Sequence, residues 1–259
     1  MNTISATATP AHRPASRMAF ALGTAAALTV AGVVPYALAL LPAAQRAALP
    51  PITVLLPLQV LQGFVLFNLM AWIGLRLGER VGLDAPLLRN WLHGEPHARS
   101  DTWWRDALVG ALLALAAVGL VVAALDQRLP TPIGGLPPAP TPWQGFLASF
   151  YGGIAEELQV RLFLMTLVAW LAARLGATRK SALLLGVVVA AIAFGAAHLP
   201  AAAQVWPLDA IVVTRTIVAN ALPGLVFGAL YARHGLECAI VAHFVTDIGL
   251  HVVAPLVAG

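Results

Sequence analysis

The sequence has few charged residues and only one cysteine. Of its 259 residues, 10% are charged and 60% are apolar, and the mean hydropathy is +0.85. A soluble domain usually carries about 25% charged residues, so this composition excludes an ordinary water-exposed surface. With Cys238 alone, an internal disulfide and a cysteine metal cluster are also excluded. We therefore predict an all-α fold, a bundle of helices that cross a lipid bilayer.

The sequence also lacks the signs of a nucleic-acid-binding protein. The pI is about 10.0 and the formal net charge is +4. However, there is no run of five like charges and no interleaving of aromatic and basic residues. An excess of basic residues is typical of the cytoplasmic loops of membrane proteins. We therefore predict the lipid bilayer as a partner and no nucleic acid.

Seven stretches reach the length of about 20 apolar residues that a transmembrane helix needs, and an eighth span stays open. The first is longer than the 7–15 apolar residues of a secretory signal, so a retained span is favoured over a cleaved one. A hydrophilic loop, 78–105, and a Pro-rich connector, 126–142, separate the early stretches. The seven predicted spans are 18–41, 52–77, 106–125, 143–173, 181–199, 208–232 and 236–257.

The lysines and arginines between these stretches are distributed unevenly. If the N-terminus is cytoplasmic, eleven lie on the inner side: Arg13, Arg17, Arg76, Arg80, Arg89, Arg99, Arg105, Arg174, Arg179, Lys180 and Arg233. Only Arg46 and Arg128 lie on the outer side. By the positive-inside rule we expect an integral multi-pass protein with its N-terminus in the cytoplasm. Residues 1–17 are polar and rich in Thr, Ala and Pro, so we expect them to be disordered there. The expected membrane is a bacterial inner membrane. A missed half-span would reverse the later helices.

Charged residues inside apolar stretches are costly, so they are functional candidates. Glu157 and Arg161 are four residues apart, so they share a helix face and can pair. Glu156 lies about 100° around the helix and has no such partner. A purely structural, self-neutralising cluster would need only one acid. We therefore predict that Glu156 is catalytic and that Glu157 and Arg161 support it.

Two later stretches carry histidines. Pro200 ends a helix, so His198 is expected at or near a helix terminus. His243 and Asp247 are four residues apart and share a face, which His251 extends. Taken alone, His198 is more typical of an interfacial or hydrogen-bonded residue than of a catalyst, and His243 with Asp247 could be a buried polar pair that positions helices. Taken with the acids of the fourth stretch, they supply the carboxylate and imidazole groups that activate water, directly or through a metal.

The order of these motifs resembles the CPBP family of type II CAAX prenyl endopeptidases and bacteriocin-processing proteins, also called the ABI family. The motifs are Glu156-Glu157…Arg161, Phe194…His198 and His243…Asp247, within residues 143–250. The resemblance implies an intramembrane endopeptidase that acts on a membrane-associated protein or peptide. It also implies a catalytic core over residues 143–259, preceded by a transmembrane region over residues 18–142. A non-proteolytic scaffold, an immunity factor or a transporter of the same fold is the alternative.

The resemblance further implies that Glu156 and His198 activate water, while His243 and Asp247 support the oxyanion. Asp247 stands where many relatives have Asn, and an anionic Asp is a poorer oxyanion donor, so its role stays open. A divalent metal such as zinc would take Glu156, His198 and His243 as ligands. The more specific His-Glu-x-x-His signature is absent, which favours a mechanism without a required metal, but both remain open.

A count along straight helices gives the candidate residues different depths. Glu156 falls in the outer half, His198 near the outer end and His243 seven residues from the inner end of its span. They can meet only if residues 200–208 re-enter the membrane or a span boundary is wrong.

In the sixth stretch, Arg215 is expected to snorkel, to pair with Asp209 or the site, or to bind a substrate carboxylate.

Overall fold

The computed structural model describes residues 15–94, 101–135 and 138–258, and all regular structure in these residues is helical. The all-α prediction is therefore confirmed. Most of the N-terminal segment expected to be disordered lies outside the described residues, as do Arg13 and Arg99.

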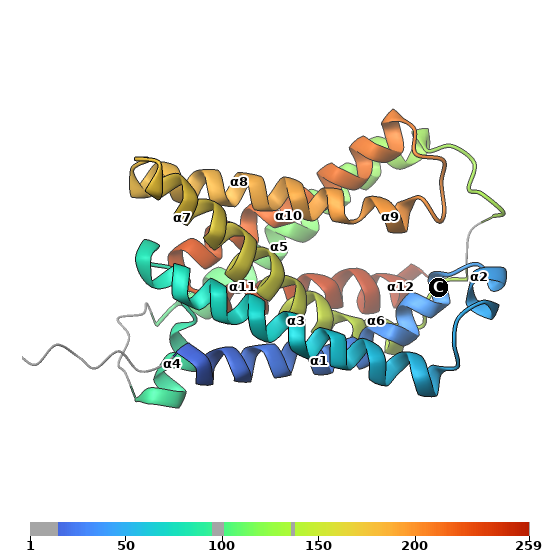
Figure 1. Ribbon diagram of the computed structural model, residues 1–259. Helices are drawn as coiled ribbons and strands as arrows, with labels where there is room; N and C mark the ends of the chain where they lie inside the picture. The colour runs from blue at the N-terminus through green and yellow to red at the C-terminus, as the bar shows by residue number, and fades with distance from the viewer. Residues whose placement is uncertain (1–14, 95–100, 136–137, 259) are drawn as a thin grey trace, which may run out of the picture.

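Long helices packed side by side make up the molecule (Figure 1). They are α1 (Ala15–Leu40), α3 (Ile52–Val81), α5 (Trp103–Leu125), α8 (Arg179–Ala197), α10 (Ala210–His234) and α11 (Leu236–Ile248). Between and after them lie the short elements α2 (Ala43–Ala47), α4 (Pro86–His93), η1 (Asp126–Arg128), α9 (Leu199–Ala202), η4 (Gly249–Val253) and α12 (Ala254–Ala258). Helix α1 packs on α3, and α10 packs on both α8 and α5.

Six helices in the described part of the chain are long and apolar enough to cross a membrane. They correspond to six of the seven predicted stretches: Ala15–Leu40, Ile52–Val81, Trp103–Arg128, Arg179–Ala202, Ala210–His234 and Leu236–Val257. Large apolar side chains such as Leu28, Leu112 and Leu120 are exposed on their surfaces, as in helices that face lipid. The chain is therefore an integral multi-pass membrane protein, whereas its orientation stays a prediction.

The predicted fourth span, 143–173, is helical but not uniform. It consists of α6 (Pro142–Phe150), the π-helical segments η2 (Tyr151–Glu156) and η3 (Leu158–Met165), and α7 (Thr166–Arg174). Thr141 and Gln144 form a capping box that fixes its start. The stretch is not among the six helices above, so a count of seven spans stays a prediction. Wide π-helical turns are uncommon and are frequent at functional sites.

The hydrophilic loop between α3 and α5 contains an ordered helix, α4. The backbone N–H of Leu88 in its first turn donates to Oε1 of Glu237 at 2.9 Å. Arg89 pairs with Asp84, whose backbone carbonyl accepts from the N–H of Leu236 at 3.0 Å. These contacts hold α4 against the first turn of α11.

Candidate active site

His243 is 5% exposed and lies among three acidic side chains, Glu156, Glu157 and Asp247. These four residues are called the cluster below. Its Nδ1 is 2.7 Å from Oε1 of Glu157. A carboxylate accepts hydrogen bonds, so this nitrogen carries the proton and donates. Nε2 of the same ring is 3.8 Å from Oε2 of Glu156 and 3.6 Å from Oδ1 of Asp247. Three carboxylates from two helices thus surround one imidazole.

Glu157 and Arg161 form a fully buried ion pair. Their side chains are 0% and 1% exposed, and Nη1 of Arg161 is 3.3 Å from Oε1 of Glu157. The pairing predicted from their spacing is therefore confirmed. The guanidinium also lies over the rings of Phe194 and Phe227 at 4.9 and 5.5 Å and donates to the carbonyl of Gly224 at 3.3 Å. Arg161 thus joins the acids to α8 and α10.

Aromatic rings connect the two histidines. Phe227 stacks on His243, with the ring centroids 4.7 Å apart. Phe194 meets His243 edge-on at 5.7 Å and His198 edge-on at 4.8 Å. His198 follows the last turn of α8, as Pro200 predicts, and its Nδ1 donates to the carbonyl of Phe194 at 2.8 Å. That bond leaves Nε2 of the partly exposed His198 as an acceptor.

Two glycines in η2 allow α11 to come close to the acids. A Cβ atom at Gly152 would collide with Oδ2 of Asp247 and would lie 3.3 Å from Nε2 of His243. A Cβ at Gly153 would lie 3.0 Å from Cβ of Phe244. The absence of side chains at Gly152 and Gly153 therefore determines how near the carboxylates and the imidazole lie.

Residues 138–249 match the family model described as type II CAAX prenyl endopeptidase Rce1-like. This region is an Rce1-like domain. It contains all the motifs that carry the resemblance, so the family interpretation is confirmed. The match supports a membrane hydrolase of the CAAX-protease type in general. No match was found among curated proteins or among solved structures.

Most of the predicted site residues meet within the Rce1-like domain. Glu156, Glu157 and Asp247 all reach His243, and His198 is connected to it through Phe194, as described above. The straight-helix count that separated Glu156 from His243 in depth was therefore wrong. It assumed straight, full-length helices, whereas the fourth span contains the π-helical segments η2 and η3. Re-entry of residues 200–208 is not needed to explain these contacts.

Arg215 is not part of the cluster. Its guanidinium makes two hydrogen bonds, at 2.9 and 3.2 Å, to the carboxylate of Asp126 at the end of α5. Pairing with Asp209, one of the alternatives drawn from the sequence, is wrong. Asp209 instead caps α10 by accepting from the backbone N–H of Val212 at 2.8 Å.

The contacts that Phe227 and Gly152 make at the site could not be predicted from the sequence. A phenylalanine in an apolar helix and a glycine pair in a span have no local mark that separates packing from a role in a site. Their importance follows only from their distances to His243.

The described residues do not form a three-ligand metal site. In the described ranges, no three His, Cys, Asp or Glu side chains are arranged so that they could hold one metal ion. The ring of Phe194 contacts both imidazoles edge-on. Because the arrangement does not fit the ligand set Glu156, His198 and His243, we derive no step through a metal.

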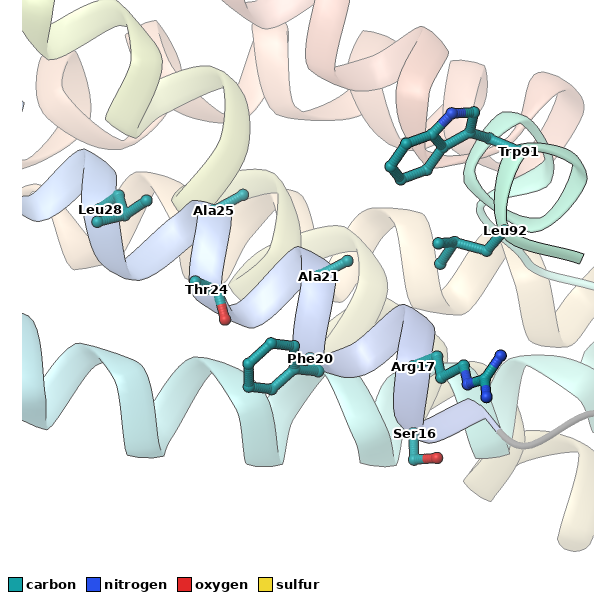
Figure 2. Close-up of a pocket in the computed structure, with 9 residues that line it drawn as sticks. All are labelled: Ser16, Arg17, Phe20, Ala21, Thr24, Ala25, Leu28, Trp91 and Leu92. Carbon is teal, nitrogen blue, oxygen red and sulfur yellow. The ribbon is translucent and has the colours of Figure 1, made fainter.

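A groove shown in Figure 2 lies apart from this cluster. It has a volume of about 640 Å³ and runs along α1 from Ser16 to Leu28, bordered by Trp91 and Leu92 of α4. None of the residues that line it belongs to the Rce1-like domain. The groove is therefore not the candidate active site.

Proposed function

We propose that the protein is an intramembrane endopeptidase that hydrolyses a peptide bond in a membrane-associated protein or peptide. The observation that carries this proposal is the asymmetry of the two adjacent acids. Glu157 is fully buried and its Oε1 contacts both Arg161 and His243, whereas the Glu156 side chain is 25% exposed and lies 3.8 Å from Nε2 of His243. This difference supports a structural role for Glu157 and a reactive role for Glu156.

Glu156 is the proposed general base. Among the residues that the structure describes, none donates a hydrogen bond to its carboxylate, so both oxygens are free to bind water. A base must lie within hydrogen-bond reach of the proton that it removes. In the proposed reaction Glu156 takes a proton from water as the oxygen attacks the peptide carbonyl. It then passes this proton to the departing amine.

His198 is the proposed second group on the water. Its Nδ1–H is committed to the carbonyl of Phe194, which fixes the ring and leaves a lone pair on Nε2. A neutral imidazole held in this tautomer accepts a hydrogen bond from the water and orients it. The position of the ring after the last turn of α8 also leaves it partly accessible.

His243 and Asp247 are proposed to support the oxyanion. Glu157 accepts from Nδ1 of His243 and so fixes the ring orientation. A protonated His243 would donate from Nε2 to the negative oxygen that forms in the transition state. Donors held in place before the reaction are the main source of such stabilisation. Asp247 would contribute as the neutral acid, since an ionised carboxylate only accepts.

The test is cleavage of a peptide library by the purified protein. We expect cleavage by the wild type and none by Glu156→Gln or His198→Ala, each with the thermal stability of the wild type. Asp126→Asn, which removes an acid outside the site, is the matched control and should cleave normally. Undiminished cleavage by Glu156→Gln would contradict the proposal, as would a wild type that cleaves no peptide.

A parallel arm with a chelator tests the mechanism. We expect cleavage to continue when the chelator is present, because the described site residues are not arranged to hold a metal ion. Cleavage that is lost with chelator and restored by zinc would show that Glu156 and the histidines act as ligands.

A further inference from the structure

A second polar pair lies next to the cluster but outside the Rce1-like domain. The hydroxyl of Tyr36 in α1 is 3.1 Å from Nδ1 of His251 in η4. The two rings meet at 69°, with centroids 5.3 Å apart. Neither residue lies within residues 138–249. Polar groups between apolar helices are costly and mark functional positions, so this pair needs an explanation.

The pair continues the stripe of the candidate site. His251 is four residues after Asp247, and Asp247 is four residues after His243, so the three follow one face. Helix α1 packs on η2, the segment that ends at Glu156, and η4 packs on α6, which leads into η2. This packing brings both members of the pair to the segment that carries the candidate catalytic acid.

Small residues in one helix bring both parts of the stripe to the same face. A Cβ atom at Gly152 would collide with Asp247, and one at Gly145 would collide with the backbone carbonyl of His251. Gly145 and Gly152 are seven residues apart, which is about two helical turns, so they lie on one side of the helix. Both ends of the stripe, at Asp247 and at His251, therefore contact the same side of α6 and η2. This line of close contact between α6–η2 and α11–η4 is called the seam below.

Helix α1 is held firmly at this seam. The side-chain amide of Gln144 donates to the carbonyl of Pro35 at 3.3 Å. A Cβ atom at Gly32 would lie 3.0 Å from the carbonyl oxygen of Leu147. These contacts, made just before Tyr36 in the chain, fix its position relative to α6.

We infer that Tyr36 and His251 form a subsite that binds the backbone of an extended peptide next to the reacting bond. This inference rests on the proposed function. A peptide that enters a low-dielectric site must have its N–H and C=O groups satisfied. The Tyr36–His251 pair can satisfy both. When Tyr36 donates to Nδ1, its oxygen still accepts, and Nε2–H of His251 donates. No described residue binds Nε2 of His251.

The test compares two tyrosine variants with a peptide that the library shows to be cleaved. Tyr36→Phe removes the subsite hydroxyl. Tyr231→Phe is the matched control: it removes a buried hydroxyl that bonds Thr166 at 3.0 Å and, among the described residues, makes no hydrogen bond to Glu156, His198 or His243. We expect Tyr36→Phe to raise KM about tenfold, the effect of one lost hydrogen bond, with little change in kcat. The control should change neither.

Binding is measured separately from catalysis in the Glu156→Gln background. Anisotropy of the same peptide, labelled with a fluorophore, gives its Kd, and we expect Tyr36→Phe to raise this Kd about tenfold as well. His251→Ala should raise it by at least as much. The double variant should add little more, because the two residues act as one unit.

Two outcomes separate the inference from the proposed function. If Glu156→Gln abolishes cleavage but Tyr36→Phe leaves KM and Kd unchanged, the subsite is overturned and the protease stands. The subsite is also overturned if Tyr36→Phe only lowers thermal stability, as Tyr231→Phe would. If Glu156→Gln cleaves normally, the proposed function itself fails, whatever Tyr36 does.

Discussion

Replacing Glu157 by leucine should destabilise the protein strongly. The carboxylate is fully buried, lies 3.3 Å from Nη1 of Arg161 and accepts from Nδ1 of His243 at 2.7 Å. Its loss leaves a guanidinium that is 1% exposed and whose remaining contacts, in the described part of the chain, are two aromatic faces and one carbonyl. Breaking a buried ion pair by removing one partner costs about 3–5 kcal/mol. We expect Glu157→Leu to lower the free energy of unfolding by at least about 3 kcal/mol.

The double variant is the sharper part of this prediction. Replacing Glu157 by Leu and Arg161 by Met removes both charges and keeps most of the buried volume. Exchange of a whole buried pair for apolar residues is often neutral or stabilising. We therefore expect the double variant to be more stable than either single variant. In a double-mutant cycle this corresponds to a coupling of at least about 2 kcal/mol, since contacting residues are not additive.

The free energy is measured by reversible unfolding in mixed detergent micelles, followed by circular dichroism. Asp126→Leu and Arg215→Met form the matched control cycle. These two side chains also pair at 2.9 Å but are 34% and 25% exposed, so their coupling should stay below about 1 kcal/mol. The reasoning is refuted if Glu157→Leu costs less than about 1 kcal/mol, or if the losses in the Glu157–Arg161 cycle simply add.

Three further predictions concern the seam and the start of the fourth span. Gly152→Ala should displace Asp247, cost about 1–3 kcal/mol by overpacking and lower kcat/KM; unchanged kinetics would contradict the close approach. Asp247→Asn should stay near wild-type activity, because an amide donates where a neutral acid does, whereas Asp247→Ala should lose about 100-fold in kcat. Equal losses in both variants would exclude the donor role. Thr141→Ala should cost about 1 kcal/mol of stability through the lost cap and leave KM unchanged; a raised KM would indicate a role beyond capping.

Local helix geometry explains what the sequence could predict. Spacing four residues apart placed Glu157 and Arg161 on one face, and the structure pairs them. Pro200 placed His198 near a helix terminus, which is where it lies. Such relations depend only on neighbours along the chain. Which acid meets His243 depends on the register between two helices, and no local pattern encodes that register. Glu157, expected only to support the site, is therefore the residue in direct contact with His243.

The π-helical turns are a second feature that a sequence count could not supply. The angle of about 100° between Glu156 and Glu157 assumes a regular α-helix. Both residues lie where η2 passes into η3, in wider turns. The wider turns change the angle between successive side chains. In this setting Glu156 and Glu157 reach opposite nitrogens of the same imidazole. The sequence distinguished the surroundings of the two acids, but it left Glu156 without any partner.

The first three predicted spans carry no motif, yet α1 reaches the seam beside the candidate site. A single tyrosine in an apolar helix gives no signal, and Tyr36 gains its meaning only through the contact with His251. That contact depends on Gly32 and Gly145, where backbones approach too closely for a side chain. The candidate catalytic groups are therefore recognisable in the sequence as acids and histidines, but the shape of the candidate site depends on glycines. If the subsite exists, residues 138–249 alone lack part of the surface that binds the substrate. Helix α1 then belongs to the enzyme rather than to its membrane anchor.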